Sequence, residues 1–258
     1  MDNFHIKRDL MVQGKNSCFS RVSIKKYKLF KNIDITSLKR INLFAGINNT
    51  GKSSLFEAIY LLATQNDIYA LFETIKRRGK FCTSMNNTWL DSQFKEDIEI
   101  EGIFDNQEAS VHISRQQEED EDFDKSGYLS TIKIDSRYRD ENLSSRARVF
   151  QNKENQYFFK NIKWICNIVF SNPFAIHNTK DLVRFHEKSV ETKSIDRIID
   201  FLKQFVDTGI EDIELAGDFK RFLVRHKNFP NALDLTQFGE GMQRIFHITF
   251  NLRQPKMG

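Results

Sequence analysis

The sequence predicts an α/β fold, and three features of the chain point to it. Residues 40–45 form a short apolar run that suits a buried strand and ends at Gly46. From Ser53 onward the apolar residues recur at helical spacing instead. Residues 96–136 show the alternation that is typical of antiparallel strands. A strand, a glycine loop and a helix therefore follow one another, and an antiparallel β region comes after them.

The chain before residue 40 is predicted to be a loose leader followed by edge strands. Residues 1–17 are polar and look unstructured, so the folded domain is taken as 18–258. Within it, residues 20–30 alternate in part and have strand character, and residues 33–35 suit a second edge strand.

The chain after residue 136 is predicted to be mainly helical up to residue 208. The basis is residues 192–207, whose apolar side chains recur at helical spacing, with Thr192 or Ser194 as the N-cap. Two strands are expected at 210–215 and 221–226, and a further helix from Glu240 within the segment 235–251.

The composition is that of an intracellular protein. The chain has 258 residues, 40% of them hydrophobic, which is ample for a real core. Its 39 basic and 35 acidic residues permit contact with nucleic acid but do not demand it. The cysteines, which are Cys18, Cys82 and Cys166, are too scattered for a disulfide framework or a zinc site. No apolar stretch is long enough to span a membrane and no signal peptide is visible, so a cytoplasmic location without membrane contact is expected.

The segment Gly46-Ile47-Asn48-Asn49-Thr50-Gly51-Lys52-Ser53 fits the pattern GxxxxGK[ST] of a phosphate-binding P-loop in full. Its glycines allow the backbone amides to approach phosphates, and the start of the following helix adds positive potential. Lys52 is expected to reach the β- and γ-phosphates of ATP, and the Ser53 hydroxyl to bind Mg²⁺. The predicted nucleotide-binding residues are Gly46, Asn48, Asn49, Thr50, Gly51, Lys52, Ser53 and Ser54.

A second glycine motif occurs near the end of the chain, in Phe238-Gly239-Glu240-Gly241-Met242-Gln243-Arg244. Two glycines flank a glutamate at what is expected to be a helix N-terminus, an arrangement that can present amides to a phosphate group. By itself the same pattern also fits a glycine turn that caps a core helix.

Together the two motifs resemble the RecF/SMC/OLD-like branch of ABC-type ATPases, which are often grouped with the AAA ATPases. The opening Val22-Ser23-Ile24-Lys25-Lys26-Tyr27-Lys28-Leu29-Phe30 and the P-loop segment resemble the start of such a head, and residues 238–244 resemble its signature motif. The usual serine of that signature is Gly239 here. The resemblance implies an ABC-ATPase head with a mixed central sheet, an antiparallel β subdomain and a helical insertion.

The resemblance also implies how such a head works. Two heads dimerise around ATP, so Gly239, Glu240 and Gly241 would face the γ-phosphate held by a partner, in a homodimer or a larger oligomer. Gln93 is a weak candidate for the family's magnesium-contacting glutamine. A nuclease or effector partner and DNA are further implied partners, with DNA repair or defence against phage as the setting. Six basic residues fit a DNA-facing patch or a solvated lysine-rich edge strand, namely Lys25, Lys26, Lys28, Lys31, Lys39 and Arg40.

Hydrolysis is the open point. Relatives carry an apolar strand ending in Asp-Glu after the signature helix, where the carboxylates support magnesium and orient the attacking water. Here the given sequence reaches Gly258 where that strand is expected, so an incomplete head is predicted. Asp135, at the end of an apolar run, is a superficial substitute that suits a surface position. The alternatives are therefore an ATPase head, a non-hydrolysing nucleotide sensor or regulatory subunit, and a truncated inactive ATPase. A P-loop kinase is disfavoured, and the acidic run 118–122 is interpreted as a solvated loop.

Overall fold

The structure is a computed structural model that describes residues 8–12, 17–47, 50–78, 86–118, 123–168, 186–187, 189–216 and 221–252. The chain divides into two compact units, Met1–Ile168 and Val169–Gly258. The P-loop lies in the first unit and the second glycine motif in the other, and each unit is described by itself.

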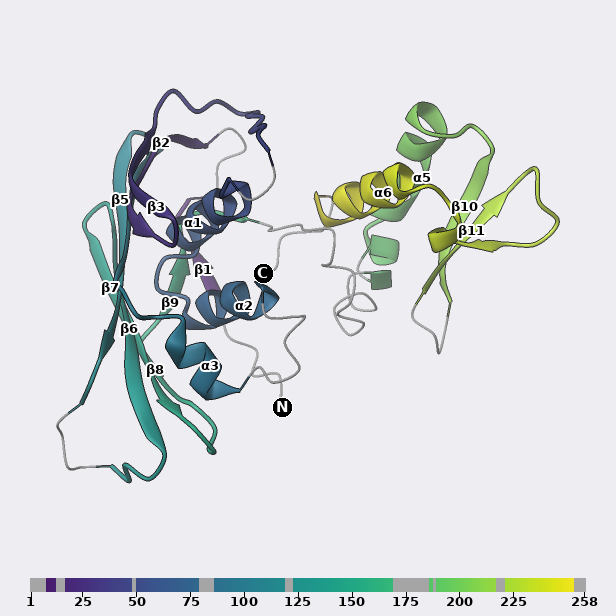
Figure 1. Cartoon of the computed structure of the whole chain (residues 1–258). Coiled ribbons are helices and arrows are strands. Elements are labelled where there is room, and N and C mark those ends of the chain that lie inside the picture. The colour runs from purple at the N-terminus through teal and green to yellow at the C-terminus, as the bar shows by residue number, and fades with distance from the viewer. Residues whose placement is uncertain are drawn as a thin grey trace. The chain divides into compact units, whose positions relative to one another are not determined.

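A seven-stranded sheet dominates the first unit (Figure 1). Its order is β3-β2-β4-β5-β6-β7-β8, and every neighbouring pair is antiparallel. The strands are β2 (Phe19–Tyr27), β3 (Phe30–Ile35), β4 (Ile98–Phe104), β5 (Gln107–Gln116), β6 (Tyr128–Tyr138), β7 (Glu141–Phe150) and β8 (Gln156–Phe159). In β4, Ile98 and Ile100 are buried while Glu99 and Glu101 are exposed, so one face of the sheet meets the core and the other meets water.

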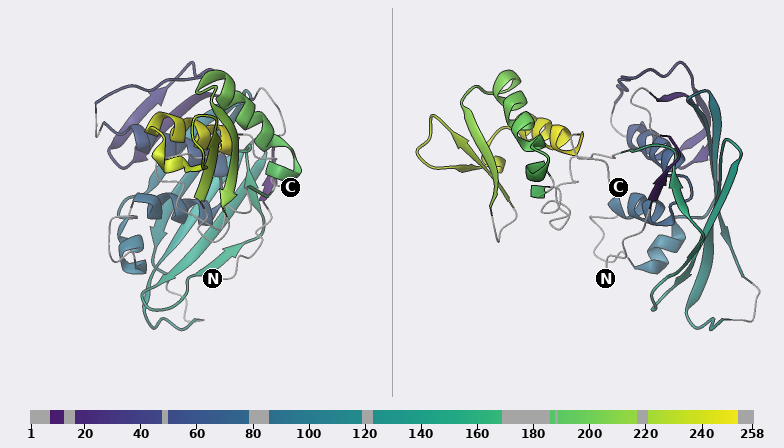
Figure 2. Two further views of the ribbon diagram at one scale, coloured as in Figure 1. Left: turned by 90° about the vertical axis from the view of Figure 1, so that its right-hand side faces the viewer. Right: turned by 180° about the vertical axis from the view of Figure 1, so that it is seen from behind.

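Three helices cover the buried face of this sheet (Figures 1 and 2). They are α1 (Lys52–Thr64), α2 (Ile68–Arg78) and α3 (Asn87–Ser92). The helix α1 packs directly on the sheet, since a Cβ added to Gly102 would lie 2.7 Å from Leu62 Cδ2. Val22, Ile24 and Leu62 are fully buried between the two layers, and this packing fixes the position of the residues at the start of α1.

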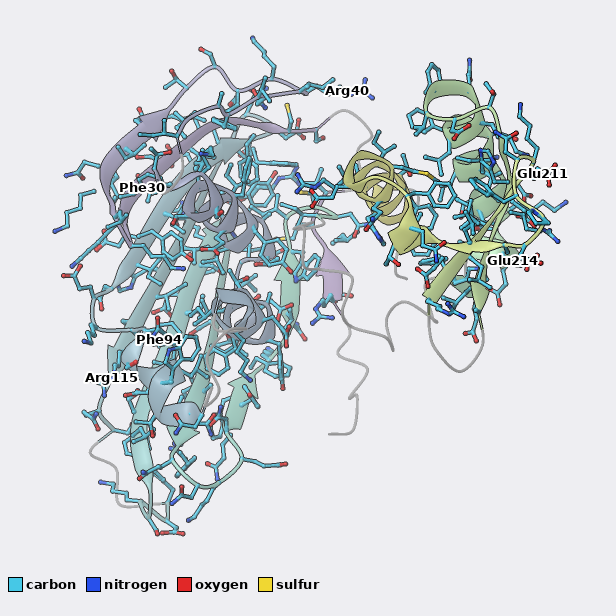
Figure 3. All side chains as sticks on the ribbon, turned by 45° about the vertical axis from the view of Figure 1, so that its right-hand side comes forward. Phe30, Arg40, Phe94, Arg115, Glu211 and Glu214 are labelled. Atoms are coloured by element: carbon cyan, nitrogen blue, oxygen red, sulfur yellow. The ribbon has the colours of Figure 1, made fainter. Side chains whose placement is uncertain are left out.

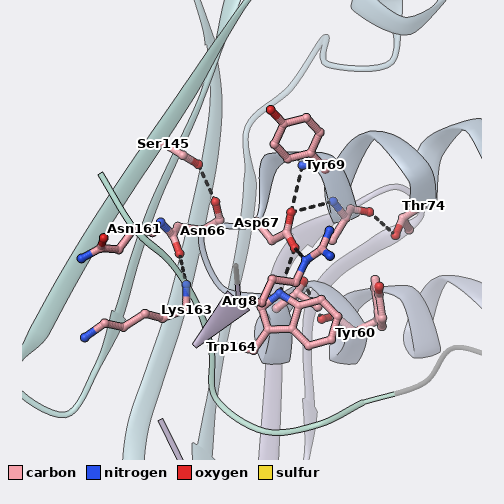
Figure 4. Close-up of polar contacts among 12 residues, drawn as sticks. Arg8, Tyr60, Asn66, Asp67, Tyr69, Thr74, Ser145, Asn161, Lys163 and Trp164 are labelled. Atoms are coloured by element: carbon pink, nitrogen blue, oxygen red, sulfur yellow. Dashed lines mark hydrogen bonds and ion pairs between the residues drawn. The ribbon is translucent and has the colours of Figure 1, made fainter. Parts of the chain in front are cut away.

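A buried polar junction joins α1, α2 and a small parallel pair made by β1 (Arg8–Leu10) and β9 (Ile162–Trp164) (Figure 4). The Asp67 carboxylate is fully buried and accepts hydrogen bonds from Arg8 Nε at 2.6 Å and Trp164 Nε1 at 2.9 Å. It also accepts from the backbone amides of Tyr69 and Ala70, and so caps α2. One side chain therefore ties the N-terminal strand, a helix start and β9 together.

The second unit has its own sheet and core. The strands β10 (Ile210–Ala216), β11 (Arg221–His226) and β12 (Leu233–Asp234) form an antiparallel sheet. They pack with α5 (Ser194–Phe205) and α6 (Glu240–Leu252), and the 3₁₀ turn Leu235–Gln237 leads to α6. Phe222, Phe246 and Phe250 form the aromatic centre of this core.

The structure corrects the prediction of a mainly helical segment at 137–208. Antiparallel strands continue through β7 and β8, and β9 follows, so helix is confined in the described part of this segment to residues after 185. The inward residues of β7 include Ser145 and Ala147, which are small because α1 and α2 meet nearby. Ser145 Oγ donates to the Asn66 carbonyl oxygen there, and small polar residues of this kind give no apolar alternation to detect.

Residues 40–45 also differ from the expectation, because they form no strand. Ile41 is 87% exposed and Leu43 is 93% exposed, in place of the predicted burial. No strand among the described residues pairs with this segment, and without a neighbour an extended run cannot bury its backbone. The large sheet is antiparallel throughout and not mixed, and the parallel pairing among the described residues is that of β1 with β9.

The N-terminal leader differs in part as well. Arg8–Leu10 pairs with Ile162–Trp164, so at least these residues are ordered by a distant partner. Among the described residues, no helix has the length and apolar character needed to cross a membrane.

Candidate phosphate-binding site at the start of α1

The P-loop glycine before the lysine stands at the N-cap of α1. Gly51 has φ 90° and ψ 7°, a left-handed conformation that favours glycine, and none of the side chains that the structure describes caps the helix start. The Gly51 carbonyl oxygen accepts the first helical hydrogen bond, from Leu55 N at 2.9 Å. The first amides of α1 therefore have no intrahelical acceptor, which is the arrangement that binds anions at helix starts.

Lys52 folds back over its own loop. Its Nζ donates to the carbonyl oxygens of Gly46 and Ile47, each at 2.6 Å. Thr50 Oγ1 donates to the Ile47 carbonyl oxygen at 3.0 Å, so the loop closes on itself. Asn48 and Asn49 lie outside the described residues.

The two serines of the motif differ in exposure. Ser53 is exposed in the first turn of α1, where its hydroxyl is open to a ligand. Ser54 is 4% exposed and faces the protein interior, which fits a role within the helix start.

The turn between β2 and β3 lies against the loop. A Cβ added to Gly51 would lie 2.6 Å from Phe30 Cζ, so the edge of the Phe30 ring is pressed against this glycine. One turn further along α1, Glu57 Oε2 accepts hydrogen bonds from Tyr27 Oη at 2.9 Å and Lys28 Nζ at 3.0 Å. The side chain of Glu57 is only 5% exposed. These contacts, which join the β2–β3 turn to α1, are not evident from the sequence motif.

The chain that enters the loop is held by one aromatic pair. The rings of Phe44 and Phe56 meet edge to face with centroids 5.7 Å apart. Phe56 lies on α1, so this contact guides the exposed segment toward Gly46. Figure 3 shows the side chains around this region, with Phe30 on β3 and Arg40 on the loop that follows it.

The second glycine motif begins α6 in the other unit. Gly239, Glu240 and Gly241 are all exposed, and a Cβ on either glycine would meet no atom within 4 Å. Glu240 forms an ion pair with Arg244 at 3.1 Å. The motif is therefore open at a helix start.

Gln93 makes contacts with its own helix. Its Nε2 donates to the Trp89 carbonyl oxygen at 3.3 Å and lies 3.2 Å from Ser92 Oγ. Gln93 also lines a cavity of about 410 Å³, together with Lys26, Lys28 and Ile75 among others. These hydrogen bonds keep the Gln93 amide on its own helix, and its role as a magnesium ligand stays a prediction.

Glu118, the first residue of the acidic run 118–122, is held by hydrogen bonds and ion pairs and is not solvated. Glu118 accepts from Arg148 Nε at 2.7 Å and Thr131 Oγ1 at 2.8 Å, and its side chain is 12% exposed. Burial alone would raise the pKa of this carboxyl, but the Arg148 and Thr131 hydrogen bonds and the charges of Arg148 and Arg146 outweigh it and lower the pKa. Residues 119–122 lie outside the described residues.

Three of the six predicted basic residues, Lys25, Lys26 and Lys28, are paired with acids. Lys25 lies 3.5 Å from Glu101, and Lys26 lies 3.4 Å from Glu96. Lys31, Lys39 and Arg40 are exposed.

Asp135 lies on the outer face of β6 in an ion pair with Lys133 at 2.8 Å, which is a surface position. Across the described part of the chain, no group of three or more His, Cys, Asp or Glu side chains is placed to hold a metal ion.

Comparisons with known proteins agree with the motif. A family model described as "AAA domain" matches residues 21–235, which include the P-loop and most of both units. An "ATP/GTP phosphatase" of Helicobacter pylori is 30% identical over 93 residues, which are 34% of this chain and 25% of that protein. The match thus spans about a quarter of the relative's length.

Proposed function

This chain belongs to the AAA domain family of nucleotide-binding ATPases, and from that premise we propose that it is an ATP-binding head of the OLD/RecF-like type that takes ATP with Mg²⁺. The observation that carries the proposal is the junction at Gly51. A left-handed glycine at the helix cap, a helix start that no described side chain caps, and a lysine that folds over the loop form the elements of a phosphate cradle in one place.

Each P-loop residue has a part in this proposal. The amides of residues 50–54 and the start of α1 would hold the phosphates, and Lys52 would exchange its two carbonyl acceptors for phosphate oxygens. Mg²⁺ prefers oxygen ligands and is bound largely through substrate phosphates and water, so it needs few ligands from the protein. The exposed hydroxyl of Ser53 fits the role of such a ligand. When bound, Mg²⁺ would neutralise phosphate charge.

Two versions of the function differ in turnover. Hydrolysis needs carboxylates that support the metal and orient water, and neither glycine motif contains them in the required position. We favour an ATPase head. The second candidate is a nucleotide sensor or regulatory subunit, in which ATP orders the head without being hydrolysed.

The partners follow from the open second motif. Gly239, Glu240 and Gly241 are exposed at the start of α6, as a contact to a phosphate on a second head requires. We propose an ATP-dependent homodimer or larger oligomer on this basis. A role in DNA repair or phage defence, with DNA, a nuclease or another effector as partner, is the corresponding biological proposal and rests on resemblance.

Calorimetry with MgATP on the full chain tests nucleotide binding, with Lys52→Ala as the variant and Lys39→Ala, an exposed lysine outside the loop, as the matched control. We expect the wild type and Lys39→Ala to bind and Lys52→Ala to lose most binding. Equal binding by all three proteins would refute a P-loop function.

Phosphate release and light scattering decide between the two versions. Release above the Lys52→Ala background supports the ATPase head, whereas binding without release supports the sensor. Growth of the particle mass on adding MgATP supports the sandwiched assembly, and Gly241→Arg, at an open position, should prevent that growth without unfolding the protein.

A further inference from the structure

We propose that the β2–β3 turn is a positioning element for the phosphate-binding loop, with Phe30 as the positioning residue and Glu57 as its anchor. The inference rests on the proposed nucleotide binding at Gly51 and Lys52, and it assigns a role to residues outside that motif.

The contact of Phe30 with Gly51 is close and directional. The three ring atoms nearest to a Cβ built on Gly51 are Cζ at 2.6 Å, Cε1 at 3.0 Å and Cε2 at 3.5 Å, so the ring points its far edge at the glycine. A glycine has more conformational freedom than any other residue, and without a neighbour Gly51 would leave its left-handed conformation easily. The ring edge limits that freedom on one side of the loop.

The turn that carries Phe30 is itself held in place by α1. Tyr27 and Phe30 pair across the turn, and Lys28 and Leu29 lie between them. Tyr27 Oη and Lys28 Nζ both donate to the same buried oxygen, Glu57 Oε2. Hydrogen bonds to a buried charged group are stronger than neutral ones, so Glu57 gives the turn a firm attachment to the helix that the loop begins.

The backbone of the turn adds a second, independent observation. Lys28 has φ 54°, a left-handed conformation that a residue with a side chain adopts at a cost. A turn with glycine at this position would avoid the cost, but it would lose the Lys28 contact with Glu57. The chain therefore keeps a lysine in a strained position where its ammonium anchors the turn.

These contacts connect the phosphate-binding loop to α1 through the β2–β3 turn. Gly51 begins α1, Glu57 lies further along α1, and the turn bridges the two through Tyr27, Lys28 and Phe30. When all of these contacts are present, the loop amides are ordered before the nucleotide binds. Without Phe30 the binding of any phosphate chain must order Gly51 as well, which corresponds to about a tenfold loss of affinity.

The experiment compares Phe30→Ala, Phe30→Tyr and Phe30→Leu in the full chain, with Leu29→Ala as the control. Leu29 is the neighbour of Phe30 in the turn and is 75% exposed. MgATP and MgADP affinities are measured by calorimetry, and apo thermal midpoints are measured alongside. Phe30→Ala removes the contact with Gly51 and should lower the affinities for MgATP and MgADP about tenfold, to the same extent for both. Because Cζ is the ring atom nearest to Gly51, the hydroxyl of Phe30→Tyr would enter the loop, so this variant should lower both affinities as well. Phe30→Leu, which ends at Cδ and lacks the Cε and Cζ atoms that contact Gly51, should weaken binding as Phe30→Ala does, whereas Leu29→Ala should bind as the wild type does.

Hydrogen exchange of the amides of residues 50–55 in the nucleotide-free protein supplies a readout that needs no ligand. Faster exchange there in Phe30→Ala than in Leu29→Ala supports the inference, and unchanged exchange overturns it even if the variant is less stable overall. If wild type binds MgATP, Lys52→Ala does not, and both Phe30→Ala and Phe30→Tyr bind normally, the inference fails while the proposed function stands. Absence of MgATP binding by the wild type overturns the proposed function instead.

Discussion

Lys52 Nζ donates to the Gly46 carbonyl oxygen at 2.6 Å, so the lysine that is expected to reach phosphate is held by the first residue of its own loop. The Ile47 carbonyl oxygen accepts from the same ammonium at the same distance. A bound nucleotide would replace the two carbonyl oxygens as the acceptor of the hydrogen bonds that Lys52 Nζ donates. The gain from phosphate is thus the difference between two carbonyl acceptors and charged phosphate oxygens, which are the stronger partners.

This exchange separates stability from binding in Lys52→Ala. The acceptors are exposed backbone oxygens that water can satisfy, so we expect the variant's free energy of unfolding to stay within about 0.5 kcal/mol of wild type. The rise in thermal midpoint that MgATP gives the wild type by mass action should be absent in the variant. Differential scanning fluorimetry with and without MgATP checks both points, and a large loss of stability without ligand would contradict the exposed position of these bonds.

Gly51→Ala should be far more harmful than Gly46→Ala. Gly51 has a positive φ and its added Cβ would meet Phe30 at 2.6 Å, whereas Gly46 would meet Thr50 Oγ1 at 3.2 Å without a positive φ. We expect Gly51→Ala to lower the free energy of unfolding by about 1–3 kcal/mol and to weaken nucleotide binding. Urea denaturation of both variants checks the difference, and similar costs for the two would show that the Phe30 contact does not constrain the loop.

Asp67→Ala should destabilise the first unit. The substitution removes the cap of α2 and the acceptor for Arg8 and Trp164 together, at about 3 kcal/mol. The fluorescence of Trp164 reports the loss directly, because this indole loses its partner. Glu73→Gln, on the exposed face of the same helix, is the control and should change stability by less than about 0.5 kcal/mol.

Gly209→Ala should destabilise the second unit. A Cβ there would lie 2.2 Å from His226 Nε2, and this ring is fixed by Asp207 at 3.2 Å and by the amide of Asn228, also at 3.2 Å. We expect a cost of about 1–3 kcal/mol. Gly239→Ala is the matched control, since its Cβ would meet no atom within 4 Å. Circular dichroism of thermal unfolding compares the two, and equal midpoints would contradict the tight packing at His226.

The second unit should lose stability in mild acid because of His247. Burial lowers the pKa of His247 from its ordinary 6.5 to about 4. Between these two values the unfolded chain takes up a proton that the folded unit does not, so stability falls as the pH falls from about 6.5 toward 4. Burial also lowers the pKa of His186 in the same unit, which acts in the same direction.

His247→Gln should flatten this pH dependence. In an NMR titration, the chemical shifts of the His247 ring protons should change only below about pH 5. Hydrogen exchange of the α6 amides at pH 7 and pH 5 then measures the stability difference in the wild type and the variant. A ring that titrates near its ordinary value would overturn the prediction.

Local patterns decided what could be predicted well from the sequence. The P-loop is a short contiguous motif, so its position at a helix start follows from residues that are neighbours in the chain. The start of α6 at Glu240 follows in the same way from adjacent glycines. The alternation of Ile98 and Ile100 with Glu99 and Glu101 likewise marks β4, because one face of the strand is buried.

Contacts between distant residues decided the rest. The strand β7 faces the core with the small residues Ser145 and Ala147. Ser145 bonds to Asn66, which lies between α1 and α2 and 79 positions earlier in the chain. The run at residues 40–45 has an apolar sequence but no neighbouring strand among the described residues, and a strand needs a partner for its backbone hydrogen bonds.

By itself, then, the sequence determined that this chain carries a phosphate-binding loop at the start of a helix in an α/β protein, because those properties reside in consecutive residues. Only the tertiary structure decided that Phe30 touches Gly51, that Glu57 anchors the turn before it, and that Asp67 joins three elements. The physical reason is that burial and hydrogen bonding depend on which distant side chain arrives at a position, and no local pattern specifies that.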